Sequence, residues 1–208
     1  MAEPTAHDGG PGRRAAGAFF LRLVLWYAVL AAPWPGVAGA YAAVYCGVAN
    51  AVFGDFGRGE VRFRPTATGH GRLDVDIGLR RGGAAADAAR APHSSRVTGF
   101  LPTAELAALV LASPIQRRRK VRALGWGMLA LHLFLLGRLW IMLLSWFAQD
   151  SPWQTLHPGS ATSAFLALAT EVLVVSPTPS FLVPLVIWLP VTFRRADLAV
   201  LAARPGAV

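Results

Sequence analysis

Long apolar runs dominate the chain and predict helices that cross a membrane. Crossing the roughly 30 Å hydrocarbon core of a bilayer takes about 20 apolar residues in a helix. Residues 23–54 carry no charge, and residues 123–147 form another long run. Residues 97–116 hold a single charge, at Glu105, and a fourth run lies within residues 162–193. The pattern therefore predicts four spans.

In the first and the fourth run, prolines inside the run predict interrupted helices. Pro33 and Pro35 lie inside the first run and should kink it. The fourth run contains several prolines, and the pair Pro177 and Pro179 predicts a break near residues 176–180.

Two of the spans keep an alternative interpretation. Residues 38–40 (Ala-Gly-Ala) have the small side chains of a signal-peptide cleavage site. The apolar run continues well beyond them and Arg22 interrupts its start, which favours an uncleaved helix. Residues 103–113 would also fit a helix that lies on the membrane surface. Pro102 and Pro114 suit the two ends of a helix and favour a complete span.

Between the first two spans, residues 55–96 change to the pattern of strands. Apolar and polar residues alternate in two short stretches, as in strands with one covered face. Residues 68–71 (Thr-Gly-His-Gly) supply a reversal, so the pattern predicts a β-hairpin at about residues 60–80. Residues 81–95, rich in glycine and alanine, predict a loop. An isolated hairpin is marginally stable in water, so this one should pack on the bundle or on a partner.

The distribution of cations orients the spans. The formal net charge is +9, yet only 15% of the residues are charged, against about 25% in soluble domains. Residues 117–122 hold five cations between two apolar runs, and Arg194 and Arg195 directly follow the last run. Dense cations beside spans mark the cytoplasmic side, which predicts that both termini are cytoplasmic and the hairpin is exported. Their position between apolar runs also argues against nucleic acid as a partner.

The predicted fold class is a membrane all-α bundle of about four transmembrane helices with a small extracytoplasmic β-hairpin insert. Its segments are a disordered cytoplasmic tail (1–17), a kinked first helix (18–54), the hairpin and its loop (55–96), a second helix (97–116), a basic cytoplasmic loop (117–122), a third helix (123–147), an outer loop (148–161), a proline-broken fourth helix (162–193) and a cytoplasmic tail (194–208).

Ionisable residues inside spans are costly and are therefore candidates for function. Glu105, Arg138 and Glu171 lie at similar depths when counted from the outer ends of their spans. An ion pair of Arg138 with either glutamate would offset much of the cost of burial. His132 lies deeper in the third span. This intramembrane polar layer would suit a small transporter component, and the alternative is that it only fixes helix packing.

Cys46 is the only cysteine, so no intramolecular disulfide can form. It falls in the outer part of the first membrane helix, and Arg138 and His157 are also predicted toward the outer face. A nearby cation favours the reactive thiolate, so these three residues are a candidate catalytic site. The alternative is an inert thiol in an apolar helix. The histidines are scattered, and the sequence predicts neither a metal site nor a cofactor.

Residues 20–27 and 98–119 carry a resemblance whose layout covers most of the chain. An N-terminal span, a short exported β segment, a span entered by Gly-Phe-Leu-Pro (residues 99–102), a basic loop and two further spans follow in order. In this order the chain resembles the small multi-pass membrane proteins encoded beside exosortases, bacterial membrane enzymes that process proteins with a C-terminal sorting signal. The resemblance implies an accessory role at the bacterial inner membrane and supplies no catalytic residue.

Three hypotheses of function follow from these observations. The leading hypothesis is a non-enzymatic integral membrane accessory or subunit protein, with the lipid bilayer and another membrane protein as its partners. The alternatives are a membrane cysteine transpeptidase or protease that uses Cys46, and a small transporter component. Exosortases resemble cysteine transpeptidases with an ordered Cys, Arg and His, an order that Cys46, Arg138 and His157 share. Cys46-Gly47 lacks the motif that surrounds the exosortase cysteine, which favours the accessory role.

Overall fold

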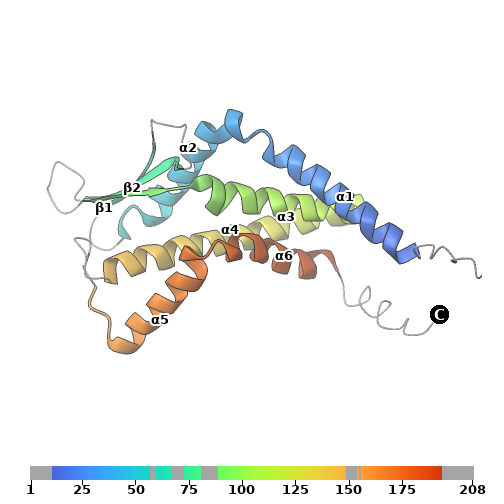
Figure 1. Ribbon diagram of the computed structural model, residues 1–208. Coiled ribbons are helices and arrows are strands. Elements are labelled where there is room, and N and C mark those ends of the chain that lie inside the picture. The colour runs from blue at the N-terminus through green and yellow to red at the C-terminus, as the bar shows by residue number, and fades with distance from the viewer. Residues whose placement is uncertain are drawn as a thin grey trace, which may run out of the picture.

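The protein is mostly helical, with a small antiparallel sheet at one end (Figure 1). The computed structural model describes residues 11–56, 60–66, 73–80, 89–148, 154 and 156–193. Within these ranges, two helices, α2 (Trp34–Phe53) and α4 (Arg117–Ala148), are long and apolar enough to cross a membrane. A bent helix pair adds a third candidate if it is counted as one span. The expectation of apolar helices with a β insert is thus confirmed at this level.

The helices run between two ends of the molecule, which we call the sheet end and the basic end (Figure 1). The basic end carries the cations of residues 117–122, where α4 begins. Toward this end, α3 (Leu101–Ala112) packs against α1 (Pro11–Ala31), α4 and α6 (Thr178–Thr192). At the other end, α2 packs against the sheet.

Prolines separate the first two helices, as the sequence predicts. Pro33 precedes α2 as its N-cap residue, and Pro35 occupies its first turn, where a missing N–H costs no hydrogen bond. The first helix begins earlier than expected, at Pro11. The prediction of a disordered tail over residues 1–17 is therefore wrong for residues 11–17. Proline in the first turn of a helix is favourable because its backbone angle is already helical.

The sheet has three antiparallel strands in the order β1 (Glu60–Pro65), β2 (Val75–Arg80) and β3 (Ala89–His93). β1 and β2 form the predicted hairpin pairing, with Phe63 opposite Ile77. β3 lies within residues 81–95, so the prediction of a loop there is wrong for residues 89–93. This strand, Ala-Arg-Ala-Pro-His, lacks the β-branched and aromatic residues that mark strands, and pairing with β2 supplies its order instead.

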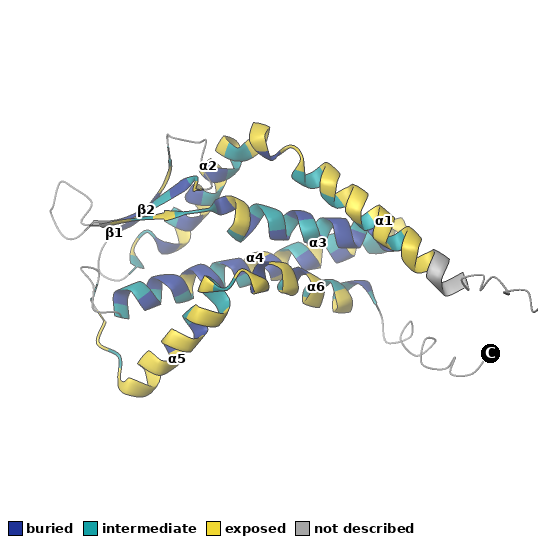
Figure 2. Cartoon of the chain, in the orientation of Figure 1, coloured by how far each residue is buried: buried dark blue, intermediate teal, exposed yellow. Residues whose placement is uncertain are grey.

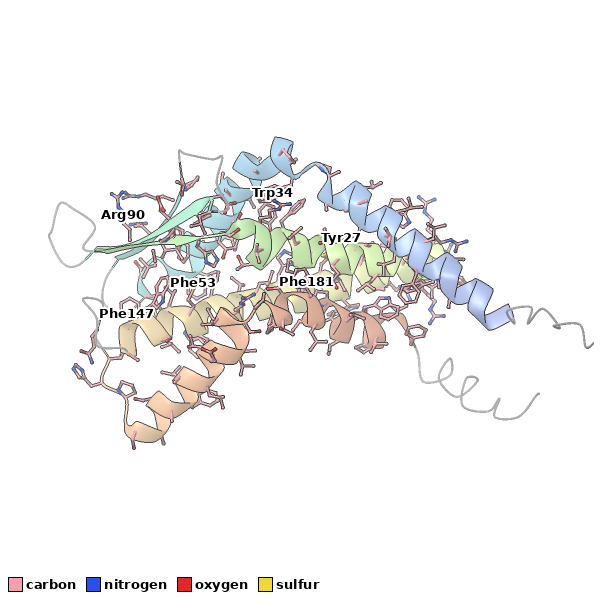
Figure 3. The ribbon with its side chains drawn as sticks, in the orientation of Figure 1. Tyr27, Trp34, Phe53, Arg90, Phe147 and Phe181 are labelled. Atoms are coloured by element: carbon pink, nitrogen blue, oxygen red, sulfur yellow. The ribbon has the colours of Figure 1, made fainter. Side chains whose placement is uncertain are left out.

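One face of the sheet covers an apolar core at the sheet end. Of the alternating apolar residues that predicted a covered face, Val61, Phe63, Val75 and Ile77 are at most 2% exposed, and they meet a helical stripe of α2 and the second half of α4. Leu73, where the alternation begins, is 45% exposed and lies outside this core. Phe53 of α2 and Phe147 of α4 belong to this core (Figure 3). Its buried members are Ala42, Cys46, Ala49, Phe53, Val61, Phe63, Val75, Ile77, Leu139, Met142, Leu143 and Phe147.

Besides this apolar packing, the Asn50 side chain of α2 forms hydrogen bonds with β1. Asn50 donates a hydrogen bond of 2.9 Å from its amide nitrogen to the Phe63 carbonyl oxygen. Its side-chain oxygen accepts a 2.8 Å hydrogen bond from the Phe63 N–H. Asn50 thus satisfies both backbone groups of Phe63 in the way that a neighbouring strand would. This arrangement protects that edge of the sheet.

The basic end is held by cations at helix termini. Lys120 donates a 2.6 Å hydrogen bond to the Leu111 carbonyl oxygen near the end of α3, and Arg119 donates to the Thr192 carbonyl oxygen at the end of α6. The last carbonyl groups of a helix lack intrahelical partners and attract cations. The prediction of a loop over residues 117–122 is therefore wrong, because these residues form the first turns of α4.

The Gly-Phe-Leu-Pro segment forms the junction between the sheet and α3. A π-helical turn, η2 (Arg96–Phe100), precedes α3, and Pro102 lies buried in the first turn of that helix. The Phe100 ring contacts Trp34 and Tyr41, with centroid separations of 4.7 and 5.4 Å. At Gly99, an added Cβ would lie 2.5 Å from the Tyr41 hydroxyl oxygen, so only glycine fits without movement.

The last helical segment is broken where the sequence predicts. α5 (Ser160–Thr170) continues into a π-helical turn, η3 (Glu171–Val175), and α6 follows after a bend of 83°. Ser176 and Pro177 occupy the break.

Figure 2 shows exposed residues along the outside of the helices, and many of them are large and apolar. Phe20 and Val24 of α1, and Phe165 and Leu168 of α5, are each more than 60% exposed. An apolar surface of this extent is typical of helices that contact lipid.

Candidate functional site

A pocket of about 340 Å³ lies where the sheet meets the helices. Its walls come from α2, the end of β3, η2, the middle of α4 and η3. Most of the residues that line it are apolar. The polar ones are Tyr45, His93, Ser94, Thr98 and Arg138. These residues come from distant parts of the chain, and the fold brings them together at the junction of two helices, a strand end and two π-helical turns.

His93, the last residue of β3, forms the polar wall with Tyr45 and Thr98. Its Nε2 lies 2.9 Å from the Thr98 hydroxyl oxygen and 3.1 Å from the Tyr45 hydroxyl oxygen. The Thr98 hydroxyl donates to the Ser94 carbonyl oxygen at 2.6 Å, which leaves its oxygen to accept. This favours the tautomer with the proton on Nε2.

Burial, and to a smaller extent the nearby Arg138 guanidinium, lower the pKa of His93 to about 4, although the Asp74 carboxylate acts in the opposite direction. His93 is therefore neutral at pH 7. It contributes hydrogen-bonding capacity to the pocket and no charge.

Asp74 stabilises the segment that directly follows His93. Its carboxylate accepts hydrogen bonds from the Ser95 N–H at 2.7 Å and from the Ser95 hydroxyl at 2.5 Å. Ser95 is completely buried, so these charge-assisted bonds fix the passage from β3 into η2. The Asp74 N–H also donates to the His93 carbonyl oxygen at 3.1 Å.

Arg138 forms the charged part of the pocket. It lies in α4, is 7% exposed, and reaches across to the bend between η3 and α6. One terminal nitrogen donates to the Ser180 hydroxyl oxygen at 2.5 Å, and the other donates to the Val174 carbonyl oxygen at 2.9 Å. Carbonyl groups at the end of a helical segment need partners from elsewhere. Arg138 supplies a donor to the Val174 carbonyl oxygen and thereby holds the bend against α4.

The polar layer predicted from the sequence is arranged differently from the expected ion pair. Arg138 forms its hydrogen bonds with Ser180 and Val174, and in the described part of the chain neither Glu105 nor Glu171 pairs with it. Glu105 lies in α3 with one carboxyl oxygen buried and unpartnered among the described residues. Glu171 is exposed.

His132 does not line the pocket around Arg138. It is exposed, and its Nδ1 lies 2.7 Å from the Met128 carbonyl oxygen one turn earlier in α4. It lines a separate, smaller pocket of about 140 Å³ beside Tyr41 and Gly99.

The three residues of the candidate thiol site are dispersed. Cys46 is 3% exposed within the apolar core at the sheet end and does not line the pocket. His157 lines a different pocket, between α4 and α5. Arg138 is therefore the only one of the three at the site described above. Among the described residues, no three His, Cys, Asp or Glu side chains lie together as a metal site would require.

The sequence did not single out Tyr45, Thr98, His93 or Asp74. Asp74 appeared only as one polar position in the strand alternation, and His93 as one of several scattered histidines. The tertiary fold alone joins them to Arg138. Comparison of the chain with known protein families, with curated proteins and with solved structures gives no match.

Proposed function

We propose that the protein is a non-enzymatic subunit of a membrane complex, anchored by its helices and joined to a membrane partner through its sheet. The observation that carries this proposal is the difference between the two faces of the sheet. One face is buried against α2 and α4. On the far face, the alternation along the strands places Arg62, Arg64 and Arg90 together with Asp76. A face of this charge fits an acidic segment of a partner protein.

The direction of the helices supports a four-pass arrangement. α1 and α2 lead together from the basic end to the sheet end, α3 returns, α4 leads out again, and the bent pair of α5 and α6 returns (Figure 1). α4 has 32 residues, about 48 Å, and so extends beyond a hydrocarbon core of roughly 30 Å. Cations concentrate on the cytoplasmic side of spans. The proposal therefore has the basic end in the cytoplasm and the sheet outside.

The edges of the sheet indicate where the partner binds. Asn50 occupies the edge of β1, whereas β3 pairs with β2 alone in the described part of the chain. An edge strand can accept a strand from another protein, and Arg90 of β3 lies on the basic face beside that edge. The resemblance of residues 20–27 and 98–119, and of the order of the segments, makes an exosortase-type sorting enzyme the first partner to test.

Crosslinking in cells tests this proposal. A photo-reactive amino acid at Arg90 should capture one dominant membrane protein, which mass spectrometry identifies. The same residue at Leu133, an apolar position of α4 that is 61% exposed, is the matched control and should capture lipid or a scatter of proteins. The double substitution Arg62→Glu and Arg90→Glu should abolish copurification of the captured protein while membrane insertion stays unchanged.

Two results would contradict the proposal. One is an identical set of products from Arg90 and Leu133. The other is a captured protein that still copurifies after the charge reversal. A dominant partner whose contact region is acidic supports both the docking surface and its chemistry.

A further inference from the structure

The pocket around Arg138 has the composition of a binding site for an amphiphilic anion. We propose that it binds the carboxylate of a molecule with an apolar chain, such as a fatty acid, with Arg138 at the carboxylate and the chain along the apolar wall. This role is separate from partner binding by the far face of the sheet.

Among the described residues that line the pocket, Arg138 is the single buried cation, and none is a carboxylate. Arg138 is 7% exposed and uses its two terminal nitrogens on Ser180 and Val174, both neutral groups. A guanidinium has five N–H donors, so two hydrogen bonds leave three. None of the described residues that line the pocket is acidic, and the Asp74 carboxylate is bound to Ser95 instead. A buried charge is costly unless it is paired, and a bound anion would pair it.

The number of charges that line the pocket favours an anion with one negative charge. His93 is neutral at pH 7 because burial lowers its pKa to about 4, so Arg138 is the one charge among the described residues that line the pocket. A monoanion neutralises this charge, whereas a dianionic phosphate would leave one negative charge unpaired at a poorly hydrated site. Arginine also matches a carboxylate in geometry, because its N–H groups point in parallel at two oxygens. The hydroxyl of Tyr45 is a further donor at the wall.

The shape and lining of the pocket select an apolar chain. Leu139 and Met142 form its inner wall and are 6% and 4% exposed. Leu73, Val97 and Val175 also line it, but they are 45%, 37% and 63% exposed and therefore form its rim. Binding pockets for small molecules commonly have volumes of 300–1,000 Å³ and a mainly apolar lining with a few polar groups. An apolar rim allows a chain to enter from the lipid.

Photolabelling of the full chain tests this inference. The protein is reconstituted into phosphatidylcholine nanodiscs at pH 8 and exposed to a palmitic acid that carries a diazirine on its chain. Peptide mapping should place the label on the segments around Val97 and Val175. Dodecanoate should compete for labelling at least tenfold better than dodecanol or dodecyl phosphate.

Variants assign the effect to the pocket. Arg138→Met should reduce labelling at least tenfold, whereas Arg122→Met, which removes an exposed cation of the same helix, should leave it unchanged. Val175→Trp fills the rim at a residue whose side chain forms neither of the two hydrogen bonds of Arg138, and it should also abolish labelling. This second variant decides the matter if Arg138→Met does not fold.

Three results would overturn the inference. Equal competition by dodecanol would mean that the pocket is a lipid crevice without selectivity for charge. Competition by dodecyl phosphate as strong as that by dodecanoate would refute the choice of a monoanion. Unchanged labelling in Val175→Trp would place the label outside this pocket.

Discussion

Replacing Asn50 by alanine should loosen the sheet from α2 more than it destabilises the rest of the protein. The substitution removes both hydrogen bonds to the Phe63 backbone, at 2.9 and 2.8 Å. A hydrogen bond contributes about 0.5–1.5 kcal/mol net, so the loss of two costs about 1–3 kcal/mol. Phe63 is 2% exposed, and its N–H and carbonyl are left without partners. The expected cost is therefore about 2–3 kcal/mol, in the upper part of that range.

Hydrogen exchange measures this effect where it should occur. A cost of 2 kcal/mol raises the equilibrium constant for local opening by about 30-fold. The peptide that covers residues 60–66 should lose protection by that factor in Asn50→Ala, while peptides from α4 change little. Val52→Ala, at an exposed position of the same helix, is the control and should behave as the wild type. A change below about threefold in residues 60–66, or an equal change in α4, would refute the reasoning.

Three further outcomes are expected. Burial lowers the pKa of His93 from 6.5 to about 4, so the unfolded chain binds more protons between these values and stability should fall as the pH drops through this window. The free energy of unfolding should fall by at most about 1.4 kcal/mol per pH unit in this window. This dependence on pH should disappear in His93→Gln, and unfolding midpoints measured at pH 7 and pH 5 test it. Cys46 is buried and should react with maleimide only after unfolding, so rapid labelling of the folded protein would contradict its burial. Cys46→Ala should lower the free energy of unfolding by about 1 kcal/mol without loss of partner crosslinking. Gly99→Ala should cost about 1–3 kcal/mol, since its Cβ would lie 2.5 Å from the Tyr41 hydroxyl oxygen. Gly47→Ala, with open space around it, is the control, and equal melting temperatures of the two variants would refute the clash.

Features set by local pattern could be predicted from the sequence. The alternation around Phe63 and Ile77 indicated a sheet with one covered face, and these residues are indeed buried opposite each other. The prolines indicated the interruption at Pro33 and the bend at Pro177. Each of these depends on neighbours within a few residues, where periodicity and proline geometry act directly.

Features set by distant contacts could not be predicted in the same way. The His93 ring meets Tyr45, which is 48 residues away in sequence. The burial of Arg138 follows from the apolar run around it, but its partners do not, because the bend at residues 176–177 creates them. The glutamates were the plausible partners by charge and depth, yet a free carbonyl group and a hydroxyl satisfy the guanidinium instead. The third strand was missed because its order comes from pairing and not from its own composition.

The first turns of α4 show why composition alone predicted a loop where this helix begins. Five cations in six residues have the composition of a solvated loop, and a helix N-terminus disfavours positive charge. Lys120 and Arg119 are nevertheless helical because the carbonyl ends of α3 and α6 lie beside them. The cations therefore stabilise the C-terminal ends of two neighbouring helices, although they are unfavourable at the N-terminus of α4.

The central claim is that the sheet end and the basic end lie on opposite sides of a membrane. Cysteine accessibility in intact cells tests it directly, with Cys46→Ala as the background so that an introduced cysteine is the only thiol. In that background, Arg90→Cys should react with a membrane-impermeant maleimide from outside, whereas Arg118→Cys should react only after the membrane is permeabilised. Reaction of both positions from the same side would contradict the four-pass arrangement and, with it, the proposed docking surface.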